Sequence, residues 1–194
     1  MPPKIVLASG SRYRQQLLSR LGIDFESCAP DIDETPKPQE SPAELAMRLA
    51  EAKAVALTKQ FPSALIIGSD QTAACGDTLL GKPGTIQRAQ EQLRLCRGKQ
   101  VTFYTGLCLI NNDTGTQETS LTPFSVSFLN LSDRQIERYI EKEQPLDCAG
   151  SFKCEGLGSA LFEKLEGQDP TALIGLPLIS LCAMLRRAGL DPLD

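Results

Sequence analysis

Residues 64–71 read ALIIGSDQ, and residues 81–83 read GKP. The apolar run 64–67 follows Pro62 and precedes Gly68, a pattern typical of a short buried strand that ends at the glycine. A buried strand of this kind belongs to a sheet that is covered on both faces. This stretch therefore predicts an α/β protein.

Two charged residues in and after this stretch suggest chemistry. Asp70 is expected just past the carboxyl end of the strand, where α/β proteins place their ligand-binding groups. Lys82 lies between Gly81 and Pro83, on a constrained turn from which its ammonium group can reach an anion. An acid and a base together indicate a metal and a phosphate. The alternative is a solvated acid and an ordinary turn.

The composition sets limits on the class of protein. The chain has 194 residues, which fits a single domain, 1–194, with two lobes. Its net charge is −4 and it has no polybasic tract, so a duplex nucleic-acid partner is not expected. It has no run of 18 apolar residues and no signal-peptide pattern, so neither a membrane span nor export is expected.

The cysteines and histidines limit the chemistry further. Seven cysteines are scattered without a C-x-x-C pair, and there is no histidine. This excludes common Cys/His zinc sites, Ser-His-Asp triads and Cys-His nucleophiles. We therefore expect a reduced, cytoplasmic protein, in which any metal has oxygen ligands and is Mg²⁺ or Mn²⁺.

Periodicity and capping signals predict the remaining elements. Strands are expected at 4–8, 23–28, 64–67, 101–110 and 119–129, and helices at 12–21, 42–59, 85–97, 133–143 and 177–188. Ser41 and Ser132 each open a capping box. The turn cluster 111–115 joins two strands into an extended hairpin. The predicted fold is α/β, with a mixed sheet, an extended hairpin, and two lobes around a cleft.

The turn after the first strand could bind an anion. Ser9 and Ser11 flank a glycine at a helix N-terminus, where backbone N–H groups and hydroxyls can face a phosphate. Arg14, one turn further on, could reach the same anion with two N–H groups. The alternative is that Ser11 only caps the helix.

The remaining candidate residues do not indicate a function individually. Asp31, Asp33 and Glu34 cluster in an acidic loop and could share a metal with Asp70, although most such clusters are solvated. Lys53 lies among small alanines within a helix, although most lysines in such places are exposed charges. The glycine-punctuated segment 150–158 could be a plain loop or could approach a ligand closely.

Together these motifs resemble one family. LASGSxxR at 7–14, DE at 33–34, RLAxxKA at 48–54, GSDQ at 68–71 and GKP at 81–83 occur in the order found in Maf proteins. VTFYTG at 101–106 and AGSFKxEG at 149–156 extend the resemblance over the whole chain. Maf proteins are nucleoside triphosphate pyrophosphatases, related in fold to inosine triphosphate pyrophosphatases, and are also named septum-formation inhibitors.

The resemblance implies roles for individual residues. The phosphate-binding positions fall on Ser9, Ser11 and Arg14. The acidic pair, Glu34 and Asp70, would hold Mg²⁺ or Mn²⁺, with Asp70 also a candidate base for the attacking water. The catalytic lysines correspond to Lys53 and Lys82. A homodimer is a further family expectation.

Three departures from the commoner Maf pattern concern the base of the nucleotide. Tyr13 replaces an arginine, Gln71 a threonine, and Glu155 a glutamine, as in the branch that acts on 7-methyl-GTP. A carboxylate can accept both the N1–H and the 2-amino group of guanine. An aromatic ring can stack on the cationic methylated base, a contact of about 1–2 kcal/mol when desolvated. The alternative is that Tyr13 packs on the surface and Glu155 is solvated.

We therefore expect hydrolysis of 7-methyl-GTP to 7-methyl-GMP and pyrophosphate, with a small-molecule nucleotide as partner. The rival hypotheses are a pyrophosphatase for dTTP, UTP or other modified nucleotides, and a nucleotide-binding regulator of septum formation. A thiol-based redox protein is poorly supported without paired cysteines.

Overall fold

The computed structural model describes residues 3–194. The strands are β1 (Lys4–Ala8), β2 (Glu26–Ser27), β3 (Ala64–Cys75), β4 (Thr78–Leu80), β5 (Gln100–Asn111), β6 (Thr116–Phe128) and β7 (Phe162–Gly167). The helices are α1 (Arg12–Ser19), α2 (Pro42–Ala56), α3 (Ile86–Cys96), α4 (Asp133–Glu143), α5 (Pro170–Ile174) and α6 (Leu178–Arg187), with short 3₁₀ helices η1 (Ala149–Ser151) and η2 (Leu157–Leu161).

Within the described residues these strands form one seven-stranded sheet in the order β2-β1-β3-β5-β6-β7, with β4 paired to β3. Strand β1 runs parallel to β2 and β3, whereas β4 and β7 pair antiparallel with β3 and β6. The neighbouring strands β5 and β6 follow one another through the short turn 112–115, as an extended hairpin requires. The predicted mixed α/β fold is confirmed.

The chain divides into two compact units. The first contains the chain up to Gln71, Tyr104–Thr122 and Asp169–Asp194, and the second contains Thr72–Phe103 and Pro123–Gln168. The prediction of a single two-lobed domain with a cleft stays a prediction.

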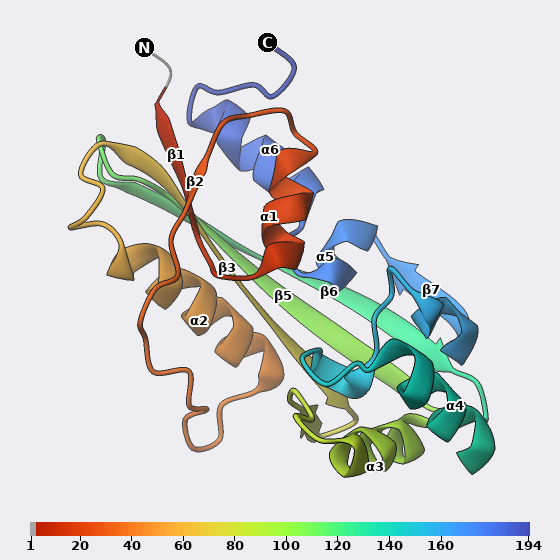
Figure 1. Cartoon of the computed structure of the whole chain (residues 1–194). Coiled ribbons are helices and arrows are strands. Elements are labelled where there is room, and N and C mark those ends of the chain that lie inside the picture. The colour runs from red at the N-terminus through yellow and green to blue at the C-terminus, as the bar shows by residue number, and fades with distance from the viewer. Residues whose placement is uncertain (1–2) are drawn as a thin grey trace. The chain divides into compact units, whose positions relative to one another are not determined.

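The core of the first unit follows the alternation of its strands. Strand side chains with odd numbers pack with α1 and α6: Ile5, Leu7, Leu65, Ile67, Leu107 and Leu109. Those with even numbers pack with α2: Val6, Ala8, Ile66, Cys108 and Ile110. Figure 1 shows α2 on one face of these strands and α1 and α6 on the other. The period of two therefore predicts which helix each later side chain of β3 and β5 will face.

Two glycines bring α2 into backbone contact with this sheet. A Cβ atom at Gly68 would lie 2.1 Å from the carbonyl oxygen of Ala50, and one at Gly106 would lie 2.3 Å from that of Ala46. The expectation that the strand ends at Gly68 is therefore wrong. The strand continues to Cys75, because the glycine gives room for the helix instead of ending the strand.

Aromatic rings pack together in the second unit. Phe152 lies edge to face with Phe103, Phe128 and Phe162 at centroid distances of 5.2, 5.8 and 4.8 Å. This geometry is the favourable one for ring pairs. The cluster joins strands β5, β6 and β7 to the segment that follows η1.

The local signals located most elements, with differences at their ends. The capping boxes at Ser41 and Ser132 are both formed, and α2 and α4 start where they predict. The helix predicted at 12–21 ends at Ser19, and the one predicted at 42–59 ends at Ala56. The strand predicted at 23–28 is reduced to β2, and residues 81–84 are irregular and form no turn. Elements β4, β7 and α5 were not predicted, because runs this short carry little periodic signal.

No helix within residues 3–194 is long and apolar enough to cross a membrane.

The contact between α2 and β3 yields a stability prediction. Gly68→Ala should lower the free energy of unfolding by about 1–3 kcal/mol, because the added methyl group overlaps the backbone of α2. Chemical denaturation measures this change. The control is Gly81→Ala, whose Cβ meets nothing within 4 Å and should change stability by less than about 0.5 kcal/mol. Equal effects of the two substitutions would contradict the packing argument.

Candidate active site

Lys53, Asp70 and Glu34 form a charged cluster in the first unit. The Lys53 Nζ atom lies 2.5 Å from Asp70 Oδ1 and 2.8 Å from Glu34 Oε1. Asp70 has an even number in β3 and therefore faces α2, which carries Lys53. Lys53 and Asp70 are each only 7% exposed, whereas Glu34 is exposed. The alternative that Lys53 is an ordinary exposed charge is wrong.

A buried ion pair of this kind is a sign of function more than of stability. Removing two charges from water costs about as much as their attraction returns, so such pairs are poor stabilisers. Charged groups that face one another away from water are concentrated at functional sites. We therefore take this cluster as the centre of the candidate active site.

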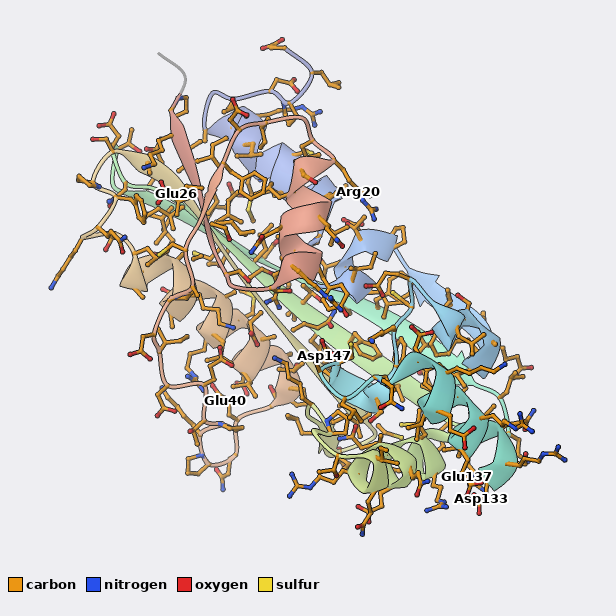
Figure 2. All side chains as sticks on the ribbon, in the orientation of Figure 1. Arg20, Glu26, Glu40, Asp133, Glu137 and Asp147 are labelled. Carbon is orange, nitrogen blue, oxygen red and sulfur yellow. The ribbon has the colours of Figure 1, made fainter. Side chains whose placement is uncertain are left out.

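The acidic loop that carries Glu34 is fixed to α2. Arg48 donates from Nε to Glu40 at 2.5 Å and from Nη2 to the other oxygen of the same carboxylate at 2.8 Å. It also donates to the carbonyl oxygen of Thr35 at 3.0 Å. The Arg48 hydrogen bonds lower the pKa of Glu40 to about 2, so the pair persists at neutral pH. Figure 2 shows Glu40 on the loop that precedes α2.

The other acids of this loop have local roles. Asp33 accepts a hydrogen bond from the backbone N–H of Thr35 at 2.9 Å, and Asp31 is exposed. Of the three acids considered from the sequence, only Glu34 contacts Lys53.

The turn between β1 and α1, which contains Ser9 and Ser11, has the expected form. The Ser9 hydroxyl accepts from the backbone N–H of Ser11 at 3.1 Å, and the Ser11 hydroxyl accepts from that of Arg14 at 3.5 Å. Ser11 is therefore the N-cap of α1, as the alternative hypothesis had it. Each hydroxyl still carries its own O–H, which can donate to an anion.

Arg14 is held by a backbone carbonyl. Its Nε donates to the carbonyl oxygen of Gly175 at 2.8 Å. Burial lowers the pKa of the Arg14 guanidinium, and the charges of Asp70 and Glu34 act in the opposite direction. Within the described residues, its two terminal nitrogens make no hydrogen bond and can form a fork for a phosphate.

Side chains on the opposite face of β3 fasten the short helix α5. The Ser69 hydroxyl lies 2.9 Å from the carbonyl oxygens of Gly106 and Gly175. The Gln71 amide donates to the carbonyls of Ala172 at 2.7 Å and Leu173 at 3.1 Å. Gly106 lies in β5, but the other three carbonyls belong to the C-terminal end of α5, where carbonyl groups lack some of their helix partners.

Thr105 of β5 adds a third fastening, since its hydroxyl donates to the carbonyl of Ala172 at 2.8 Å. Sequence reasoning assigned Gln71 to the substrate and missed Ser69 and Thr105. Their odd positions, on the face opposite to Asp70, were the available signal.

Tyr13 lies beside a cation that was not predicted. The Arg12 guanidinium lies 4.9 Å from the centroid of the Tyr13 ring and also donates to its hydroxyl at 3.0 Å. The ring thus makes a cation–π contact, here with a neighbouring side chain. The proposed contact of Tyr13 with a methylated base stays a prediction.

Lys82 and Glu155 belong to the second unit. Lys82 is exposed in the irregular segment after β4. The Glu155 carboxylate is exposed and accepts a hydrogen bond from the Cys154 thiol at 3.2 Å. Burial, with the Glu155 charge, raises the pKa of Cys154 to about 12, so this thiol keeps its proton and can donate it.

The donor set is suited to a cation that arrives with its substrate. Within residues 3–194 there is no group of three or more His, Cys, Asp or Glu side chains that could hold a metal by itself. Glu34 and Asp70 offer two carboxylates side by side, joined through Lys53. Mg²⁺ is commonly held by one or two carboxylates together with substrate phosphates. The residues therefore fit such an ion.

Two carboxylates lie near a buried lysine and a partly buried arginine, an arrangement suited to a polyphosphate and its metal. A family model described as Maf-like protein matches residues 4–188. The chain therefore belongs to the Maf family.

Among its relatives is a 7-methyl-GTP pyrophosphatase from Nitrosococcus oceani. It is 56% identical over 188 residues, which cover 97% of this chain and 94% of that protein.

Two solved structures show weaker similarity. A HAM1 protein from Coxiella burnetii has a TM-score of 0.49 at 17% identity, covering 66% of this chain and 74% of its own. The Ham1 protein of Staphylococcus aureus has a TM-score of 0.46 at 15% identity, covering 80% of this chain and 89% of its own.

The fastening of α5 yields a prediction about Gln71. Gln71→Leu should lower the free energy of unfolding by about 1–3 kcal/mol, because it leaves the carbonyl of Leu173 without its donor. Thermal or chemical denaturation without nucleotide measures this. Gln87→Leu, on an exposed face of α3, is the control and should cost less than about 0.5 kcal/mol. An unchanged stability in Gln71→Leu would remove its structural role.

Proposed function

We propose that this chain hydrolyses 7-methyl-GTP to 7-methyl-GMP and pyrophosphate. The observation that carries the proposal is the Lys53–Asp70–Glu34 cluster, where a buried cation and two carboxylates meet. Membership of the Maf family supports pyrophosphatase chemistry, and the 7-methyl-GTP pyrophosphatase at 56% identity supports the choice of substrate.

The cations of the first unit would bind the triphosphate. The terminal nitrogens of Arg14, whose Nε donates to the Gly175 carbonyl, can donate to two phosphate oxygens, and the Ser9 and Ser11 hydroxyls can donate to others. Lys53, and Lys82 from the second unit, can stabilise negative charge that grows on the leaving pyrophosphate. Within the first unit, Arg14 and Lys53 are already held by hydrogen bonds, so they need little reorganisation during the reaction.

Asp70 is the proposed base. Its carboxylate would take a proton from water while the water oxygen bonds to phosphorus and the α–β bridging bond breaks. The bonding electrons leave with pyrophosphate. Lys53 holds the carboxylate at 2.5 Å and so fixes where the proton is accepted.

We propose Mg²⁺ or Mn²⁺ as the cofactor, held by Glu34 and Asp70. When bound, it would neutralise part of the triphosphate charge and orient the water.

We propose that residues that depart from the commoner Maf pattern select the base of the nucleotide. The exposed Glu155 carboxylate has two oxygens that can accept the N1–H and 2-amino groups of guanine, while one of them also accepts from Cys154. Tyr13 is proposed to stack on the methylated base after the exposed Arg12 side chain moves aside. Gln71 contributes through α5, and a contact with the base is not needed to explain it.

The same proposal includes a cytoplasmic location and a small-molecule nucleotide as the partner, with no duplex nucleic acid. None of the seven cysteines forms a disulfide within the described residues, which supports a reducing compartment. The family resemblance supports a homodimer.

A nucleotide panel tests the substrate. With Mg²⁺ or Mn²⁺ present, pyrophosphate release should be fastest from 7-methyl-GTP, slower from GTP and slowest from UTP and dTTP, because only a guanine edge matches the Glu155 carboxylate. Preference for UTP or dTTP would keep the pyrophosphatase and overturn the base assignment. Binding without release from any nucleotide would favour the regulator.

A substitution tests the base. Asp70→Asn should reduce pyrophosphate release by about 10²–10⁴-fold, the usual contribution of a general base, since the amide cannot take the proton. Calorimetric titration with 7-methyl-GTP should still detect binding, because Arg14 and both lysines remain. Full activity in this variant would remove Asp70 from the catalytic role.

A further inference from the structure

The loop 153–158, which carries Glu155, is fastened to the C-terminal end of α4. The Lys153 ammonium donates to the carbonyl oxygens of Glu143 at 2.9 Å and Gln144 at 3.4 Å. A cation is favourable at this end of a helix, where carbonyl groups lack partners. The backbone N–H of Lys153 also donates to the Tyr139 hydroxyl at 3.0 Å.

The carboxylate of Glu143 holds the other side of the same loop. It accepts the backbone N–H of Leu157 at 2.8 Å. A Cβ atom at Gly156 would lie 2.6 Å from one of its oxygens, so the carboxylate lies directly on the loop backbone. Glu143 therefore contacts the loop twice, through its main-chain carbonyl and through its side chain.

Both ends of the loop continue into the core of the second unit. Phe152 is 5% exposed within the aromatic cluster, and Leu161 is 3% exposed. The loop closes on itself as well, since the N–H groups of Gly156 and Gly158 donate to the Lys153 carbonyl at 3.3 and 3.1 Å. Glu155 is thus an exposed side chain on a backbone that is fixed from several directions.

Lys153 and Glu143 contribute differently. Lys153 lies in the loop itself, whereas Glu143 lies on α4, and no hydrogen bond or ion pair of the described residues joins it to Glu155. An effect of Glu143 on base choice would therefore have to pass through the loop backbone.

We propose that Glu143 is a specificity-determining positioning residue, which fixes the loop so that the Glu155 carboxylate meets the guanine edge. This inference rests on the proposed function of Glu155 as the reader of the base. The side chain of Glu143 acts as an acceptor for Leu157 N–H, and its negative charge is not required.

Two substitutions at this position separate acceptor from charge. Glu143→Ala removes the acceptor, and Glu143→Gln keeps an oxygen that can accept the same N–H. Glu141→Ala is the matched control on the same helix, since the Glu141 side chain is exposed and makes no contact with the loop among the described residues. Leu157 is 41% exposed, so water can replace the lost acceptor and the Ala variant should fold.

The measurement is the preference for 7-methyl-GTP over UTP, taken both as a ratio of kcat/KM and as a ratio of binding constants. Glu143→Ala should reduce this preference about ten- to a hundred-fold. This is the loss expected when the charge-assisted hydrogen bond between the Glu155 carboxylate and guanine no longer forms. Glu143→Gln and Glu141→Ala should keep it within about twofold. Hydrogen exchange at Leu157 should quicken only in the Ala variant.

A double variant separates positioning from a general loss of structure. In a Glu155→Gln background, adding Glu143→Ala should leave the preference unchanged, because the residue being positioned no longer reads the base. A further reduction there, or an unchanged preference in Glu143→Ala alone, would overturn the proposal.

The same experiment distinguishes failure of the proposed function. If the wild-type chain releases no pyrophosphate from any nucleotide, the pyrophosphatase proposal fails, while the binding ratio still tests Glu143. If Glu155→Gln alone leaves the preference unchanged, Glu155 does not read the base and the positioning role falls with it.

Discussion

The direct contact between the backbone of α2 and strands β3 and β5 is the constraint on which the site depends. Ordinary side chains at 68 and 106 would keep the helix away from the sheet. With glycine at both positions, a lysine in the last turn of α2 reaches a carboxylate in the middle of β3. The close approach also keeps this ion pair out of water, which strengthens every electrostatic interaction within it.

One short segment of β3 serves two different purposes. Asp70 faces α2 and the charged cluster, whereas Ser69 and Gln71 face α5 and hold its carbonyl groups. The Gly175 carbonyl accepts from both Ser69 and Arg14, so the fastening of α5 also orients a cation. The residues that hold α5 and the acid of the charged cluster are therefore neighbours in sequence but lie on opposite faces of β3.

Local sequence signals predicted correctly those features of the fold that depend only on residues close together in the chain. The capping boxes at Ser41 and Ser132 involve partners three residues away, and both were located correctly. Gly68 was misread because a glycine in an apolar run suits the end of a strand as well as the close approach of a helix. Only the packed structure, with the Ala50 carbonyl beside it, distinguishes the two.

The candidate site also contains residues that sequence motifs indicate and contacts that only the folded structure shows. Family motifs indicated Glu34, Lys53 and Asp70, and the structure brings these three together. The partners of Gln71 lie about a hundred residues further along the chain, at Ala172 and Leu173, beyond what any local pattern can indicate. The contacts of Glu143 with the loop 153–158 depend in the same way on how α4 ends.

The alternation along β3 also limits how this gene segment can change in length. Inserting or deleting one residue between Ala64 and Asp70 would move the acid to the face of α5 and place its neighbours against α2. A change of two residues would restore the face but displace the carboxylate by about 7 Å along the strand, beyond the reach of Lys53. Substitutions can be tolerated here one at a time, but the number of residues between the start of β3 and Asp70 is fixed.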